Sequence, residues 1–172
     1  YSLSVSGCPA KIGATAIEVI GLDLADGDAI REVIRQVRPD QVFNLAARAS
    51  SAQLFDDAVA TAEINGLAVV RMLEAIRTES AETRFCQASS SEVFANSSVS
   101  PQDELTPLRP RNAYGAAKVF AQNMVQAYRE RYGMFACAAI LFNHESPRRD
   151  LNYVTRKITA AAARIKAGLE RS

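Results

Sequence analysis

Cysteine and histidine are scarce in this sequence, and their spacing argues against a metal site. The 172 residues contain three cysteines, Cys8, Cys86 and Cys137, and no CxxC pair. Cysteines this far apart are typical of reduced thiols in a cytosolic protein rather than of a disulfide framework. The single histidine, His144, stands at no familiar ligand spacing from any of them. We therefore expect a cytoplasmic protein that holds no metal ion.

An excess of one charge and long apolar runs are also absent. The net charge is +1, with 20 basic and 19 acidic residues, so the composition does not predict a nucleic-acid surface. No apolar run is long enough to cross a bilayer. The first residues, YSLSVSGCPAKIGA, lack the basic and then apolar layout of a secretory signal. We expect neither nucleic acid nor a membrane as a partner.

Hydrophobic residues make up 48% of the chain, enough for the core of one globular domain. Apolar, β-branched runs predict strands at 16–24, 41–47, 83–89 and 135–143. Apolar residues at helical spacing predict helices between Asp26 or Asp28 and Pro39, within 57–78, from about 113 to 132, and over 154–167.

This alternation predicts an α/β fold, a doubly wound parallel sheet of the Rossmann-like kind that is incomplete at the N-terminus. The run 41–47 is apolar on both faces, as parallel strands between helices tend to be. The stretch 96–112 carries three prolines and is expected to be a loop. Ligands of such sheets bind beyond the carboxyl ends of the strands. The residues to examine are therefore Asp23, 46–50, 89–92 and 143–149.

Two motifs at those strand ends carry chemistry. In NAYGAAK, Tyr114 and Lys118 are four residues apart and share one helix face, where a lysine can stabilise a phenolate for general base catalysis. In QASSSEVF, three serines and Glu92 follow a strand, and a serine hydroxyl there can hold a substrate oxygen. Simpler interpretations are also open. Tyr114 and Lys118 could be an ordinary pair on a helix surface, the serines could form a turn or a helix N-cap, and Glu92 could be a solvated loop carboxylate.

Together, the serines at the end of a strand and the later Tyr-x-x-x-Lys resemble the extended short-chain dehydrogenase/reductase superfamily acting on nucleotide sugars. GLDLAD (21–26) and NLAA (44–47) fit the same plan. The loop LFNHESPRR (141–149), with YGAAK before it and VTRKI (154–158) after it, is similar to the GDP-mannose 4,6-dehydratase family. The resemblance runs from about Asp23 to Gly168.

The resemblance implies an enzyme with NADP as cofactor and GDP-mannose as substrate, converted to the 4-keto-6-deoxy sugar. Tyr114 would take the C4 hydroxyl proton while hydride passes to the nicotinamide, and Lys118 would hold the nicotinamide ribose. Glu92 would remove the C5 proton before water leaves C6 and the hydride returns there. Ser90 stands at the family's threonine position and would orient the sugar hydroxyl.

The resemblance also assigns contacts with the two ligands. The cofactor set, besides Tyr114 and Lys118, is Asp23, Leu24, Leu45, Ala46, Ala47, Arg48, Ala49, His144 and Arg149. Weaker candidates for the phosphates of the sugar nucleotide are Asn143 and Lys157. The family assembles as dimers or tetramers through two long helices, which correspond here to 57–78 and 113–132, so we expect a homo-oligomer in the full-length form.

The chain departs from the family pattern at several points. No GxxGxxG motif is present, because Gly7 and Gly13 are too far apart and lack a third glycine. The chain stops before the part that closes over the nucleotide, and Ala95 replaces a glycine of the family. We therefore expect a fragment that binds NADP poorly and turns over little. The alternatives are another nucleotide-sugar epimerase, dehydratase or reductase, in which Glu92 would be dispensable, and a non-catalytic remnant.

Overall fold

The computed structural model describes residues 10–12, 15–49 and 57–170, and for residues 10–17 it describes the backbone alone. The chain divides into two compact units, Tyr1–Leu141 and Phe142–Ser172. Within the described ranges, no helix has both the length and the apolar character that crossing a bilayer requires.

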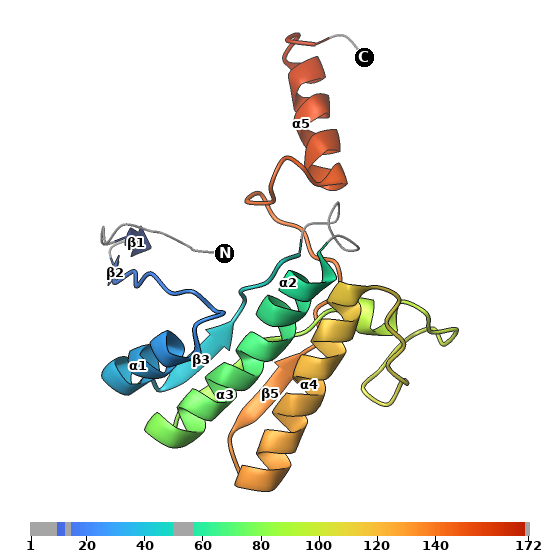
Figure 1. Ribbon diagram of the computed structural model, residues 1–172. Coiled ribbons are helices and arrows are strands. Elements are labelled where there is room, and N and C mark those ends of the chain that lie inside the picture. Colours follow the sequence, from blue (N-terminus) through green and yellow to red (C-terminus); the bar gives the residue numbers. More distant parts are fainter. Residues whose placement is uncertain (1–9, 13–14, 50–56, 171–172) are drawn as a thin grey trace. The chain divides into compact units, whose positions relative to one another are not determined.

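The first unit is built on a parallel sheet whose strand order is β3-β4-β5 (Figure 1). The strands are β3 (Gln41–Asn44), β4 (Arg84–Ala88) and β5 (Ala136–Ala139). Their register aligns Phe43 with Cys86 and Cys86 with Cys137. Each strand lies inside a predicted range, so the prediction of these three strands is confirmed. Strands β3 and β5 end earlier than expected, because the chain leaves the ladder to form the loops beyond the carboxyl ends.

Helices connect these strands at the predicted places. Helix α1 (Gly27–Val37) follows Asp26, whose carboxylate accepts a hydrogen bond from the Ala29 amide at 2.9 Å. A continuous helical run leads to β4, made of α2 (Ala58–Ala62), the π-helical segment η2 (Glu63–Leu67) and α3 (Ala68–Glu79). Helix α4 (Ala113–Tyr132) joins β4 to β5 and ends at Gly133, whose φ of 66° suits a residue without a Cβ.

One face of the sheet is buried under α1, α3 and α4, which lie side by side in Figure 1. Phe85 of β4 is 1% exposed and packs among aliphatic side chains from these helices. The buried cluster includes Ile30, Leu73, Ile76 and Val125. The apolar residues whose spacing predicted the helices are therefore the residues that form this core.

The opposite face of the sheet is exposed within the first unit. Phe43 is 64% exposed and Phe135 is 65% exposed, and Cys86 and Cys137 lie half-buried between them as free thiols. Crossover connections between parallel strands have one hand. Since the strands follow one another in order across the sheet, all of their helices lie on the same side.

The prediction of a strand at 16–24 is wrong: the strand in the structure is shorter, and it does not join the parallel sheet. The structure has β1 (Ala10–Ile12) paired antiparallel with β2 (Thr15–Ile17), and the chain from Glu18 to Asp26 contains no strand. A strand needs a neighbour to pair its backbone groups, and in the described chain β3 pairs only with β4. Leu22 and Leu24 instead pack against the core, which explains why this segment is apolar.

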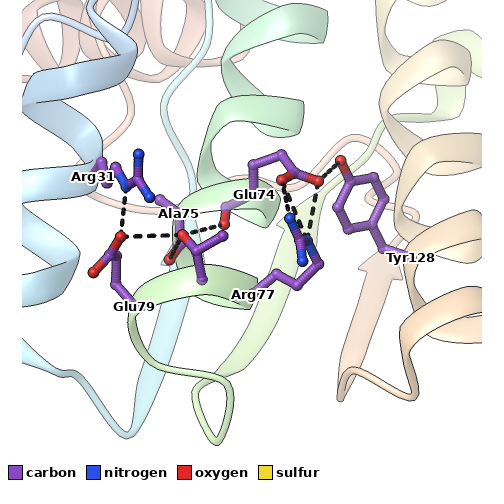
Figure 2. Close-up of polar contacts among 7 residues, drawn as sticks. Arg31, Glu74, Ala75, Arg77, Glu79 and Tyr128 are labelled. Atoms are coloured by element: carbon purple, nitrogen blue, oxygen red, sulfur yellow. Dashed lines mark hydrogen bonds and ion pairs between the residues drawn. The ribbon is translucent and has the colours of Figure 1, made fainter.

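Polar contacts join the helices at their outer surface (Figure 2). Arg31 of α1 bonds to Glu79 of α3 at 2.5 Å. Glu74 of α3 pairs with Arg77 at 2.7 Å and accepts a hydrogen bond from the hydroxyl of Tyr128 on α4. The Arg77 guanidinium and the Tyr128 hydroxyl hold the pKa of Glu74 below its ordinary value. These contacts fix the positions of α1 and α4 on either side of α3.

The second unit consists of a loop and helix α5 (Val154–Lys166), close to the predicted range 154–167. The Arg149 guanidinium lies over the Tyr153 ring, 3.6 Å from its centroid, and its Nε lies 3.5 Å from a Glu145 carboxylate oxygen. Thr155 donates a hydrogen bond to the same carboxylate at 2.6 Å. The loop is thus attached to the first turn of α5 through one acidic side chain.

Candidate active site

The serines of QASSSEVF lie where β4 ends, as predicted, and they have different partners. The Ser89 hydroxyl is buried and donates to the Gln122 side chain of α4 at 3.0 Å. Ser90 caps the short 3-10 helix η3 (Ser91–Phe94), its oxygen accepting from the Glu92 amide at 3.2 Å. This cap uses a lone pair of the Ser90 oxygen and leaves its O–H free to donate. The N-cap interpretation is therefore confirmed, and it is compatible with a contact to substrate.

Tyr114 and Lys118 lie on one face of α4, in its first two turns, as their spacing predicted. The Lys118 ammonium is 5.6 Å from the centroid of the Tyr114 ring. Lys118 is 2% exposed and donates a hydrogen bond to the Ala88 carbonyl at 2.7 Å. Burial lowers the pKa of Lys118 from 10.5 to about 8. The end of β4 and the start of α4 are therefore linked through the lysine of the predicted pair.

Glu92 is held against the start of the same helix. Its Oε2 accepts a hydrogen bond from the Asn112 side-chain amide at 2.8 Å, and Arg111 Nε lies 3.8 Å from that oxygen. The backbone of Glu92 also approaches α4 at Gly115, where an added Cβ would lie 2.7 Å from the Glu92 carbonyl oxygen. The structure therefore brings Glu92, Tyr114 and Lys118 to the junction of β4, η3 and α4.

The turn 45–49, predicted to lie along a cofactor, is fixed by a buried side chain from η2. Asn65 is 1% exposed, and its amide makes two hydrogen bonds with the backbone of Arg48, at 2.8 and 3.0 Å. Asn44 at the end of β3 accepts from the Ala46 amide at 3.2 Å. Leu45 is 73% exposed. The turn is therefore held by its backbone, while an apolar side chain remains accessible.

Asp23 and Leu24 precede α1 and differ in exposure. Asp23 is exposed, and its carboxylate accepts from the Ala25 amide at 2.9 Å. Leu24 is half-buried against the core. A structural role therefore accounts for Leu24, and only Asp23 presents a polar group to a ligand.

The other predicted contacts belong to the second unit. Asn143, His144 and Lys157 are exposed, and the His144 ring lies 2.9 Å from the Phe142 carbonyl through Nδ1. Arg149 lines a hollow of about 370 Å³ together with Glu145, Ser146, Thr155, Arg156 and Thr159. Two guanidinium groups beside hydroxyls and a carboxylate give this hollow hydrogen-bonding groups suited to a phosphate or a sugar.

Sequence reasoning missed the polar side chains that support these groups. Gln87 accepts from Asn44 and donates to Ala88 O, the carbonyl that Lys118 also contacts, both at 2.8 Å. Asn65 and Asn112 were missed as well. Gln87 interrupts an otherwise apolar strand, and Asn112 stands just before a predicted helix. Those two positions could have been found from the sequence, whereas Asn65 lies inside a regular helical pattern.

Comparison with known proteins places the sequence in a family. The family model described as "GDP-mannose 4,6 dehydratase" matches residues 7–172. GDP-mannose 4,6-dehydratase of Vibrio cholerae is 46% identical over 151 residues, 87% of this chain and 41% of that protein. GDP-mannose 4,6 dehydratase 2 of Arabidopsis thaliana is 43% identical over 166 residues, 94% of this chain and 44% of that protein.

A solved structure described as "RMD from Pseudomonas aeruginosa complexed with NADPH" matches with a TM-score of 0.77 at 26% identity. The match covers 87% of this chain and 50% of that chain. The Rossmann-like fold predicted from the sequence is confirmed. The chain spans less than half the length of the two curated relatives, 41% and 44%. On the family match and the sequence identity, the chain belongs to the GDP-mannose 4,6-dehydratase family.

Proposed function

We propose that this chain carries the catalytic groups of an NADP-dependent GDP-mannose 4,6-dehydratase, a hydro-lyase. The reaction converts GDP-mannose to GDP-4-dehydro-6-deoxymannose and water. The observation that carries the proposal is the position of Glu92, which lies at the start of the helix that bears Tyr114 and Lys118. Oxidation at C4 alone needs one base, whereas loss of water between C5 and C6 needs a second.

The residues present fit the ribose and nicotinamide end of NADP. The Lys118 ammonium has three donors, of which one goes to the Ala88 carbonyl, and the others suit ribose hydroxyls. The backbone of 45–49 is fixed by Asn65, which suits a turn lying along a flat ligand. The similar Pseudomonas aeruginosa structure is described as complexed with NADPH. NADP, when bound, supplies the two-electron acceptor and donor that C4 oxidation and C6 reduction require.

The side chains divide the proton transfers between them. The Ser90 O–H donates to the C4 oxygen and holds it near Tyr114. Tyr114 takes the C4 hydroxyl proton, and the Lys118 ammonium stabilises the phenolate that makes this possible. The resulting ketone acidifies the C5 proton, which Glu92 removes, and the C6 hydroxyl takes this proton from Glu92 as it leaves as water. Tyr114 lies on α4 and Glu92 lies on η3. Because the two bases are held on different elements, Tyr114 can act at C4 while Glu92 acts at C5.

The substrate assignment rests on the relatives that carry GDP-mannose in their names. Within the second unit, Arg156 beside the hollow suits the diphosphate, with Asn143 and Lys157 as the predicted contacts, whereas His144 and Arg149 belong to the predicted cofactor set. The cytoplasmic location and the homo-oligomer expected from the sequence belong to the same proposal.

The test is to extend the chain with the N- and C-terminal parts of a homologous GDP-mannose 4,6-dehydratase, to incubate the purified protein with NADP and GDP-mannose, and to detect the 4-keto-6-deoxy product by NMR and mass spectrometry. We expect product from the extended wild-type protein, and a loss of about 100-fold or more for Tyr114→Phe and for Glu92→Gln. Arg84→Gln, an exposed change on β4 away from the site, is the matched control and should keep wild-type activity. A folded chain that binds NADP and forms no product would refute the proposal. Full activity of Glu92→Gln would instead favour an epimerase or a reductase.

A further inference from the structure

Asn112 makes two contacts that belong to different parts of the site. Its side-chain oxygen accepts from the Gly115 amide at 2.7 Å and so caps α4, the helix of Tyr114 and Lys118. Its side-chain nitrogen donates to Glu92 Oε2 at 2.8 Å. Asn112 is 8% exposed, so both hydrogen bonds are largely shielded from water. One amide therefore sets the position of the carboxylate relative to the helix.

The amide also makes the two oxygens of the carboxylate different. The Asn112 N–H donates to Oε2, and a proton on that oxygen would use one of its lone pairs and weaken this hydrogen bond. Arg111 lies on the same side, 3.8 Å from Oε2. Among the described residues, Oε1 has no hydrogen-bond partner. The contacts at Oε2 therefore favour Oε1 as the oxygen that takes a proton.

The close approach of α4 to η3 makes this arrangement rigid. Gly115 leaves no room for a Cβ beside the Glu92 carbonyl oxygen, so the helix start and the Glu92 backbone are in direct contact. Asn112 is the cap of that helix start, and it reaches the side chain of the same glutamate. Serine or threonine could supply the capping oxygen. Neither has an amide N–H that could donate to Glu92.

We propose that Asn112 is a positioning residue for the dehydration step, which binds Glu92 Oε2 and thereby presents Oε1 to the C5 proton. This inference rests on the proposed function, because only a 4,6-dehydratase uses Glu92 as a base. Asn112 would then have two roles, as the N-cap of α4 and as the donor that orients Glu92.

The first test uses variants that keep the cap and lose the donor. Asn112→Ser and Asn112→Thr both retain a capping oxygen and add no charge beside Glu92, so their thermal stability should stay close to wild type. We expect kcat to fall about 10- to 100-fold, the range for losing a hydrogen bond to a charged group, with little change in KM. Arg111→Gln, which removes a long and exposed ion pair, should cost at most about fivefold.

An isotope effect separates positioning from general damage. With GDP-mannose deuterated at C5, the primary isotope effect on kcat should be larger in Asn112→Ser than in wild type, because removal of the C5 proton becomes the slow step. A smaller kcat with an unchanged isotope effect, or wild-type kcat in both cap-retaining variants, would overturn the proposal.

The second test needs no turnover, so it distinguishes this proposal from the proposed function. The side-chain amide protons of Asn112 are followed by NMR in the labelled chain and in Glu92→Ala. Loss of the acceptor should move one of them upfield and speed its exchange with water, while the backbone amide of Gly115 keeps its position. If the wild-type chain makes no product but this shift is seen, the proposed function fails and the contact stands. Unchanged Asn112 resonances in Glu92→Ala would sink the inference itself.

Discussion

At the scale of single residues, Lys118 is a group whose charge depends on the fold. Burial lowers its pKa from 10.5 to about 8. Between those two values the unfolded chain binds a proton that the folded chain does not, so the free energy of unfolding rises with pH over this window. The contribution amounts to at most about 3 kcal/mol. Below pH 8 the folded protein carries the buried ammonium and loses that contribution.

We therefore predict that wild type gains stability over Lys118→Met as the pH rises from about 8 to 10.5. Methionine keeps the length of the side chain and removes the titrating group, so the difference between the two proteins isolates Lys118. Urea denaturation at about pH 7, 9 and 10.5 measures it. A difference that stays constant across this range would show that Lys118 titrates alike in the folded and unfolded chains.

At the scale of elements, the contact between α4 and η3 depends on Gly115. A Cβ there would lie 2.7 Å from the Glu92 carbonyl oxygen and 3.1 Å from Pro110 Cβ, both parts of the backbone or of a rigid ring. We predict that Gly115→Ala forces α4 and η3 apart, at a cost of about 1–3 kcal/mol, and reduces activity by moving Glu92 away from Tyr114.

Gly66→Ala provides the matched comparison, since Gly66 also lies in a helical segment. A Cβ at Gly66 would meet the Phe120 ring at 3.1 Å, and Phe120 is 41% exposed and can turn aside. Replacing a helical glycine by alanine gains up to about 1 kcal/mol, so this variant should be as stable as wild type or slightly more so. Guanidinium denaturation of both variants checks the pair, and equal losses of stability would refute the explanation.

The same elements show what sequence patterns can predict. Helix α4 was predicted from about Ala113 to Tyr132 by its apolar spacing, and the Asn112 cap and Gly133 that bound it in the structure are local features too. The carboxylate of QASSSEVF was predicted to be catalytic, but its contact with Asn112 was not. That contact joins residues 20 positions apart, and it depends on how closely α4 packs on η3. Local patterns cannot predict such a distance.

At the scale of the whole molecule, the sequence did not determine which faces of the sheet are covered by other segments. An apolar run such as 41–47 predicts a strand that is buried on both faces, yet Phe43 in β3 is 64% exposed. The covering of a face depends on which other segments lie against it and not on the strand's own residues. The first unit therefore presents an apolar surface, formed by Phe43, Phe135 and the half-buried Cys86 and Cys137, on a sheet whose other face holds the core.

This asymmetry predicts opposite outcomes for phenylalanines of the same sheet. Phe85 is 1% exposed and faces the helices, whereas Phe135 is 65% exposed and faces away from them. Phe85→Ala should destabilise the chain by about 3–5 kcal/mol, through lost burial and the cavity left behind. Phe135→Ser should change stability by less than about 1 kcal/mol, and together with Phe43→Ser it should reduce self-association, because exposed apolar patches promote it. Urea denaturation and sedimentation velocity measure the two effects. A cost for Phe135→Ser equal to that for Phe85→Ala would mean that the exposed face is covered in solution.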